Sequence, residues 1–157
     1  MPANSLKELV DWVKANPSQG SYGTPAAGTL PHFFAVSFAR AAGLDLRHVG
    51  YRGSAAALTD LVGGQIPILV TTTSDLLEQH KAQRIRVLAT SDAQRSPFLP
   101  ELPTFREAGV PEFDLASWTV MLAPKGTPTE IVNNLRKEVI AIIDDPTTRD
   151  ALSSSRG

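Results

Sequence analysis

Apolar residues recur along the chain at helical spacing in some segments and at strand spacing in others. The first helical stripe follows the S-x-x-E sequence of Ser5 and Glu8 and consists of four apolar residues: Leu6, Leu9, Val10 and Val13. A serine with a glutamate three residues later caps a helix, because each side chain accepts a hydrogen bond from a backbone N–H near the other residue. The pattern therefore predicts a helix that ends at about Ala15, before Asn16-Pro17.

Three further segments show the helical spacing, and each begins or ends at residues typical of a helix terminus. They are expected from about Thr29 to Gly43, from Gly53-Ser54 to Gly63-Gly64, and from about Ser74 to Ala82. In the first of them, Phe34, Phe38 and Ala41 are expected to point inward. Pro31 fits only in the first turn of that helix, because an interior position needs the N–H that proline lacks.

The clearest helix signal lies near the C-terminal end. The sequence Thr127-Pro128-Thr129-Glu130 supplies a capping threonine, a proline at the first helical position and a capping glutamate. Four apolar residues at helical spacing follow: Ile131, Leu135, Val139 and Ile142. A short last helix is expected from about Asp145-Pro146.

Short apolar segments alternate with these helices and are predicted to be strands. They lie around Tyr22, at Leu46 to Tyr51, at Ile66 to Val70, at Ile85 to Ala89, and at Ser117 to Ala123 with Trp118, Val120 and Leu122 on one face. The continuous run from Ile66 to Val70 suits a strand buried on both faces, with Pro67 in its first residues or at an edge. The alternation predicts an α/β fold with an open, mostly parallel sheet flanked by helices. The proline-rich stretch from Ser91 to Pro111 is expected to cross between lobes or to carry function.

Composition excludes several classes of partner and site. The 157 residues are 42% hydrophobic, enough for one substantial core, and their longest apolar runs are too short to cross a bilayer. Fifteen basic and sixteen acidic residues are spread along the chain, so no basic surface for nucleic acid or an anionic membrane is expected. Cysteine is absent from the sequence, which excludes disulfides, thiolate nucleophiles and cysteine metal sites.

Polar residues follow three of the predicted strands, where each strand passes into a helix. They occupy the loop from Gly23 to Thr29, the segment from Tyr51 to Ser54, and the segment from Thr71 to Asp75. Loop N–H groups and a helix dipole bind an anion without a basic side chain, and Arg52 can pair with a carboxylate through two parallel hydrogen bonds. The alternative interpretation of each segment is an ordinary turn or helix cap. In a parallel sheet all three meet at one edge, which favours a binding site there.

No catalytic or metal-binding motif is recognisable. The loop from Gly23 to Thr29 lacks the lysine of a P-loop and the spacing of a dinucleotide site, and Gly53-Ser54-Ala55-Ala56 is not a nucleophile elbow. His32, His48 and His80 show no metal spacing and are expected to be surface or boundary residues. We therefore expect no enzyme activity, no cofactor and no metal.

Motifs spread over nearly the whole chain closely resemble the tripartite tricarboxylate transporter receptors, the TctC or Bug family. In chain order they are Tyr22-Gly23-Thr24, Gly28-Thr29, His48 to Gly53, Ala56 to Leu61, Gly63-Gly64-Gln65, Arg84 to Ala89, Arg95-Ser96, Leu99 to Thr104, Glu107-Ala108-Gly109 and Ala123 to Pro128. The resemblance implies a periplasmic-binding-protein-like fold of type II, in which a carboxylated solute is caught between two lobes and passed to a membrane permease.

The resemblance also implies how this chain relates to such a receptor. Residues 1–116 would be the second ligand-binding lobe, and residues 117–157 would return to pack with a first lobe that this sequence lacks. The signal peptide, the start of the first lobe and the C-terminal helix would be missing, and the full-length parent would be periplasmic. Apolar surface left bare would then be covered by a second copy of the chain, giving a homodimer of the fragment.

Site residues follow from the resemblance position by position. Thr24, Ala27, Gly28 and Thr29 are expected to bind the carboxylate, with Tyr51 and Gly53 as the neighbouring wall. Three further candidates are departures from the family pattern: Arg52 replaces a frequent lysine, and Thr71 and Thr72 replace an Asp-Asn pair. Because that acid would suit a ligand amine or a protonated carboxyl, its loss favours a purely anionic or aromatic acid, such as a dicarboxylate or tricarboxylate.

One alternative function has the same general architecture. The effector-binding domain of a transcription regulator would also be an α/β fold with a small-molecule cleft. No helix-turn-helix segment is visible in the sequence to support a regulator. The expectation therefore stays with a carboxylate receptor.

Overall fold

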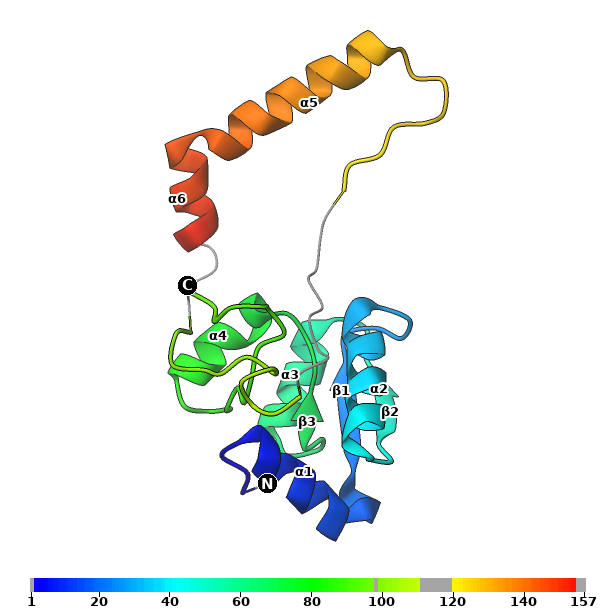
Figure 1. Cartoon of the computed structure of the whole chain (residues 1–157), viewed down its shortest axis with the longest axis vertical. Helices are drawn as coiled ribbons and strands as arrows, with labels where there is room; N and C mark the ends of the chain where they lie inside the picture. The colour runs from blue at the N-terminus through cyan, green and yellow to red at the C-terminus, as the bar shows by residue number, and fades with distance from the viewer. Residues whose placement is uncertain (1, 98, 111–119, 155–157) are drawn as a thin grey trace. The chain divides into compact units, whose positions relative to one another are not determined.

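The computed structural model describes residues 2–97, 99–110 and 120–154. The chain divides into two compact units, Met1–Ser117 and Trp118–Gly157. The first unit contains the sheet with the helices around it, and the second contains two helices (Figure 1). The assignment of residues 1–116 and 117–157 to lobes of a receptor stays a prediction.

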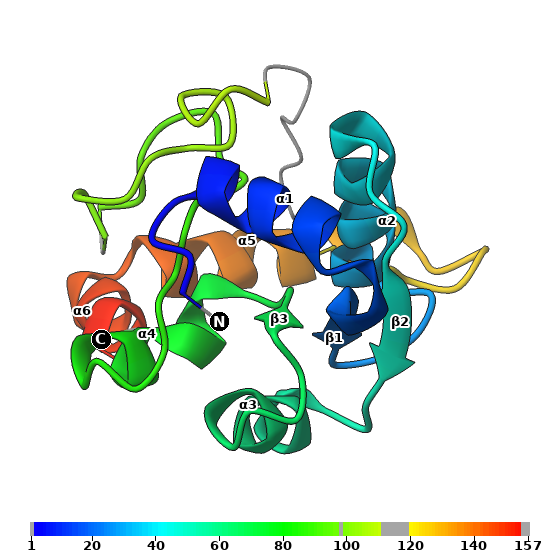
Figure 2. The ribbon, with the colours of Figure 1, turned by 90° about the horizontal axis from the view of Figure 1, so that it is seen from below.

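The first unit alternates helices and strands as expected. Its elements are α1 (Leu6–Ala15), the 3-10 helix η1 (Pro17–Gln19), β1 (Ser21–Thr24), α2 (Leu30–Ala42), β2 (Arg47–Gly50), α3 (Ser54–Val62), β3 (Ile68–Leu69) and α4 (Thr73–Lys81). The strands form one parallel sheet in the order β2-β1-β3, with Tyr22 opposite His48 on one side and Ile68 on the other. The predicted α/β fold with a parallel sheet is confirmed. Helix α2 covers one face of the sheet and α3 the other (Figures 1 and 2).

Local signals at the helix ends explain where α1 and α2 begin and end. The Ser5 hydroxyl oxygen accepts a hydrogen bond from the Glu8 N–H at 3.2 Å, and the Glu8 carboxylate accepts one from the Asn4 N–H at 2.8 Å. The predicted capping is confirmed, with its return bond one residue earlier than in the standard capping box. Gly43 ends α2 in the left-handed conformation, at φ 63°, which glycine adopts without steric cost.

The core of the first unit lies between α1, α2 and the segment that follows α4. Phe105 packs edge-on against Phe34 and Phe38, with ring centroids 4.8 and 5.6 Å apart. The stretch from residue 91 to 110 is therefore anchored to the core. Ala41 is exposed, so its predicted inward direction is wrong. The buried face of α2 is centred on Phe34, Ala35, Phe38 and Ala39, and Ala41 lies at its margin in the last turn.

Two strand predictions need correction in this unit. The run from Ile66 to Val70 forms only the two-residue strand β3, which starts after Pro67 and is half-buried, so burial on both faces is wrong. Strand β3 is an edge of the described sheet, as the proline requires. The segment from Ile85 to Ala89 forms no strand: its Val87 N–H donates to a side chain, His80 Nδ1, at 3.3 Å, and an isolated β-bridge follows the segment, between Thr90 and Thr104.

The second unit contains α5 (Thr129–Asp144) and α6 (Pro146–Ser154), which confirms both predicted helices. Pro128 lies at the N-cap of α5, so the predicted cap at Thr127 is wrong by one residue. The Thr127 hydroxyl donates instead to the Pro124 oxygen at 2.8 Å. The predicted strand from Ser117 to Ala123 lies partly outside the described residues, and residues 120–123 are not in a strand.

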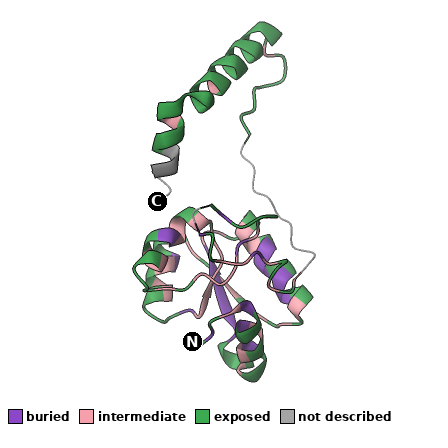
Figure 3. Cartoon of the chain, turned by 60° about the vertical axis from the view of Figure 1, so that its left-hand side comes forward, coloured by how far each residue is buried: buried purple, intermediate pink, exposed green. Residues whose placement is uncertain are grey.

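The apolar residues of α5 share one helix face and are largely exposed (Figure 3). They include Ile131, Val132, Leu135, Ile142 and Ile143. In the part of the chain that the structure describes, no helix is long and apolar enough to span a bilayer.

Candidate functional site

Hydrogen bonds join the three polar loops at the carboxyl edge of the sheet into one structure. The Gly53 N–H donates to the Pro25 oxygen at 2.8 Å, which ties the second loop to the first. The Ser54 hydroxyl donates to Asp75 Oδ2 at 2.6 Å, which ties the second to the third. We call residues 24–29, 51–54 and 71–75 the strand-end cluster. It contains all nine predicted site residues: Thr24, Ala27, Gly28, Thr29, Tyr51, Arg52, Gly53, Thr71 and Thr72.

The first loop presents backbone N–H groups at the start of α2. Gly28 has a φ of 74°, and its N–H donates to His32 Nδ1 at 3.0 Å. Thr29 is the N-cap of α2, yet its hydroxyl donates to the Ala26 oxygen at 2.8 Å and makes no capping bond to the helix. The first turn of α2 therefore keeps N–H groups without a side-chain cap, next to the positive end of the helix dipole.

The Thr24 side chain supports this loop through hydrogen bonds. Its side chain is fully buried, and its hydroxyl donates to the Ala26 oxygen at 3.1 Å. The same hydroxyl oxygen lies 2.7 Å from His48 Nε2. Because the Thr24 hydroxyl has a single proton and the Ala26 oxygen receives it, the His48 nitrogen must carry the proton of the second bond. Thr24 therefore shapes the loop and has no donor left for a ligand.

The second loop forms a wall and carries a positive charge. The Tyr51 hydroxyl donates to Asp60 Oδ2 at 2.8 Å, so its proton is not free for a ligand. Burial raises the pKa of Tyr51, and the Asp60 carboxylate raises it further. The Tyr51 ring lies over Gly23, where a Cβ would come within 2.9 Å of it. Arg52 is exposed.

The third loop surrounds a carboxylate with hydroxyls. Asp75 Oδ2 accepts hydrogen bonds from Ser54 and Thr71, both at 2.6 Å, and from Thr72 at 2.9 Å. Burial alone would raise the pKa of Asp75, but these three bonds and the Thr72 backbone outweigh it and lower the pKa. Thr72 is the N-cap of α4 and does not cap it with its side chain. The hydroxyl of this threonine serves the carboxylate instead.

Two histidines stack beside the first loop, which sequence reasoning did not anticipate. The rings of His32 and His48 lie 4.0 Å apart and nearly parallel, and Tyr22 packs against His48 at 5.0 Å. Burial lowers the pKa of His48, and the charge of His32 lowers it further. The available signal was the register of β1 and β2, which sets His48 opposite Tyr22. Asp75 was part of a recognised segment but was not singled out, because its bonds depend on how α3 packs on α4.

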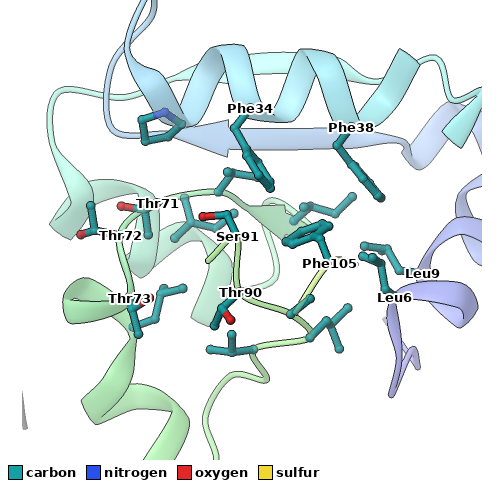
Figure 4. Close-up of a pocket in the computed structure, with 18 of the residues that line it drawn as sticks. Leu6, Leu9, Phe34, Phe38, Thr71, Thr72, Thr73, Thr90, Ser91 and Phe105 are labelled. Carbon is teal, nitrogen blue, oxygen red and sulfur yellow. The ribbon is translucent and has the colours of Figure 1, made fainter. Parts of the chain in front are cut away.

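A cavity of about 360 Å³ lies next to this cluster, and most of the residues that line it are apolar. Phe34 and Phe38 project into it from α2 toward Phe105, and Thr71 and Thr72 stand at its edge (Figure 4). Of the nine predicted residues, only these two threonines line it. A carboxylate among the rings of Phe34, Phe38 and Phe105 would lose its hydration and gain no hydrogen bond from those rings. The strand-end cluster, with its backbone N–H groups and Arg52, is therefore the better anion site.

The geometry of the strand-end cluster does not suggest a metal site. Among the described residues, no three His, Cys, Asp or Glu side chains come together in a way that could hold a metal ion. The chemistry that the cluster offers is noncovalent: backbone donors, a guanidinium, and a carboxylate with its hydroxyls.

Comparison with known proteins places the chain in a family. Residues 1–156 match the family described as "Tripartite tricarboxylate transporter family receptor". A UPF0065 protein from the tcbD-tcbE intergenic region of Pseudomonas sp. (strain P51) is 34% identical over 157 residues, which are 97% of this chain and 47% of that protein. The chain thus spans about half the length of the relatives it matches.

Among the solved structures that are similar to this chain, three illustrate the likeness. R. palustris Rpa4515 with adipate has a TM-score of 0.88 and 34% identity, covering 99% of this chain and 52% of that one. The periplasmic binding protein BugD has a TM-score of 0.86 and 31% identity, with coverage of 99% and 52%. MatC from Rhodopseudomonas palustris with bound malate has a TM-score of 0.84 and 26% identity, with coverage of 98% and 52%. The chain belongs to the tripartite tricarboxylate transporter family of receptors, as its sequence motifs indicated.

Proposed function

We propose that this chain is part of an extracytoplasmic solute-binding receptor that captures a small carboxylate and leaves it chemically unchanged. The observation that carries the proposal is the uncapped start of α2 beside Gly28, at the carboxyl edge of a parallel sheet. N–H groups and a helix dipole at such a place attract an anion. The adipate and malate in similar structures support a carboxylate as that anion.

In this proposal the carboxylate binds mainly to the backbone. A ligand oxygen takes the place of His32 Nδ1 as acceptor of the Gly28 N–H, and the neighbouring loop N–H groups, from Ala27 to Thr29, donate to the same carboxylate. Arg52 adds a full positive charge from the second loop. Tyr51 and Gly53 close that side as a wall. Binding then requires no basic residue within the first loop.

The remaining half of the receptor would come from sequence outside this chain. We assign residues 1–116 to the second lobe and residues 117–157 to the segment that returns to the first lobe. The periplasm as the location, and a membrane permease as the partner that receives the solute, fit the family description and the name of BugD. The family match favours this receptor over the effector-binding domain of a regulator.

Arg52 offers a direct test with a matched control. Arg47 is also exposed, but it begins β2 at the opposite end of the strand from Arg52. Calorimetric titration of the full-length receptor with dicarboxylates should show affinity falling by about tenfold in Arg52→Ala, because a charged hydrogen bond is lost. Arg47→Ala should bind as the wild type does. Equal losses in both variants, or no binding of any carboxylate by the wild type, would refute the proposal.

A further inference from the structure

The side-chain bonds of the Asp75 carboxylate all fall on one of its two oxygens. The three hydroxyls that reach it bond to Oδ2. None of the described side chains donates to Oδ1, the Thr72 backbone gives the carboxylate one further hydrogen bond, and Asp75 is half-buried. An ionised carboxylate has about four acceptor sites on its two oxygens, so Asp75 can accept a further hydrogen bond from a ligand donor.

The three hydroxyls around Asp75 have also lost their capacity to donate. Ser54, Thr71 and Thr72 each have one proton, and each gives it to Asp75. What they present to a ligand is therefore lone pairs. Together with Oδ1, these three hydroxyls offer acceptors to a ligand, and Asp75 adds a negative charge.

The strand-end cluster therefore offers hydrogen-bond donors on one side and acceptors on the other. Its first loop supplies N–H donors beside the N-terminus of α2, and its second loop adds the positive charge of Arg52. Its third loop supplies acceptors around Asp75. The Gly53 and Ser54 bonds join the two sides. A carboxylate is attracted to the first side and repelled from the other, where a ligand hydroxyl or ammonium group is accepted.

We propose that Asp75 selects acids that carry a hydrogen-bond donor next to the carboxylate, that is, hydroxy acids or amino acids. This inference rests on the proposed function and narrows its ligand class. It reverses the expectation drawn from Thr71 and Thr72, because the acid missing at those positions is restored at Asp75, and both threonines serve it. A purely anionic or aromatic acid has no donor for Asp75, so it bonds only to the first and second loops of the cluster.

A matched series of four-carbon acids tests the inference without any variant. Succinate has no donor on its chain, malate has a hydroxyl and aspartate has an ammonium group. Calorimetry on the full-length receptor should show malate or aspartate binding at least about tenfold more tightly than succinate, as expected for one hydrogen bond to a charged acceptor. Whichever of the two binds better identifies the donor.

Variants of α4 then assign the preference to Asp75. Asp75→Asn should reduce the preference to within about threefold while succinate binds as well or better, because the repulsive charge is gone. Glu78→Gln, on the exposed side of the same helix, should keep the wild-type preference. If Asp75→Asn fails to fold, the comparison of the three acids on the wild-type receptor still decides whether a donor next to the carboxylate is preferred.

The outcomes separate the two proposals. Wild-type receptor that binds succinate as tightly as malate and aspartate overturns the inference and leaves the carboxylate receptor standing. A folded Asp75→Asn variant that keeps the full preference overturns the inference in the same way. Failure of every acid to bind overturns both proposals.

Discussion

The Nε2 atom of His48 lies 2.7 Å from the Oγ1 atom of Thr24, so a histidine on β2 fixes a threonine at the end of β1. Thr24 in turn holds the Ala26 oxygen of the loop that we propose to bind the carboxylate. The loop is therefore supported from the neighbouring strand.

Stability should fall in mild acid because of this histidine. The pKa of His48 in the folded chain lies below its ordinary value of 6.5, through burial and the nearby His32. The unfolded chain therefore binds more protons in this range, and stability is complete above the unfolded pKa and lost as the pH falls through the folded one. Urea unfolding from about pH 7.5 to about pH 5.5, above the titration of the carboxylates, should show this loss.

The variant His48→Gln should lose less stability over the same pH range. Glutamine keeps an amide that can donate to Thr24 but cannot gain a proton. Identical pH dependence in the wild type and the variant would assign the acid sensitivity to another group.

Alanine at the two ends of α2 should separate binding from stability. Gly28 and Gly43 both have positive φ, at 74° and 63°, and a Cβ at either would meet no atom within 4 Å. Each substitution should cost about 1 kcal/mol of unfolding free energy through backbone strain alone. Only Gly28→Ala should weaken binding, because only Gly28 lies in the candidate site. Calorimetry and urea unfolding of both variants check this, and equal binding by the two would remove Gly28 from the site.

Gly23 should tolerate no side chain. A Cβ there would lie 2.6 Å from Ile66 Cδ1 and 2.9 Å from Tyr51 Cε2, so Gly23→Ala forces both side chains to move. We expect a loss of about 1–3 kcal/mol in the free energy of unfolding. Because valine lacks the Cδ1 atom, adding Ile66→Val should recover part of that loss in the double variant. A double variant whose loss is the plain sum of the single ones would show that Ile66 is not the residue in the way.

The exposed apolar face of α5 should drive self-association of the 157-residue chain. Leu135 and Ile142 lie on this face, 50% and 58% exposed. We expect light scattering to report a dimer or larger species, and Leu135→Lys to shift it toward the monomer. A monodisperse wild-type monomer would contradict the homodimer expected for the fragment.

Much of the first unit could be predicted because its signals are local. Ser5 and Glu8 mark the start of α1, Gly43 ends α2, and the apolar segments of β1 and β2 lie between such signals. The loops of the candidate site could be located for the same reason. Parallel strands bring their carboxyl ends to one edge, and this follows from topology alone.

The wrongly predicted strand from Ile85 to Ala89 and the missed contacts of Asp75 and Thr24 share a physical cause, which is dependence on a distant partner. The apolar run from Ile85 to Ala89 has the composition of a strand, but a strand exists only where a neighbour completes its hydrogen bonds. The bonds that saturate Asp75 Oδ2 join residues as much as 21 positions apart, and no local pattern reports them. The contact of Thr24 with His48 likewise needs the register of two strands.

A crystal structure of the full-length receptor with a bound acid tests the central claim most directly. We predict that a ligand carboxylate oxygen lies within about 3 Å of the Gly28 backbone nitrogen, in the place that His32 Nδ1 occupies here. The hydroxyl or ammonium group of the ligand should approach Asp75 Oδ1. A carboxylate lying among Phe34, Phe38 and Phe105 in the apolar cavity, with the Gly28 N–H still bonded to His32, would contradict the account.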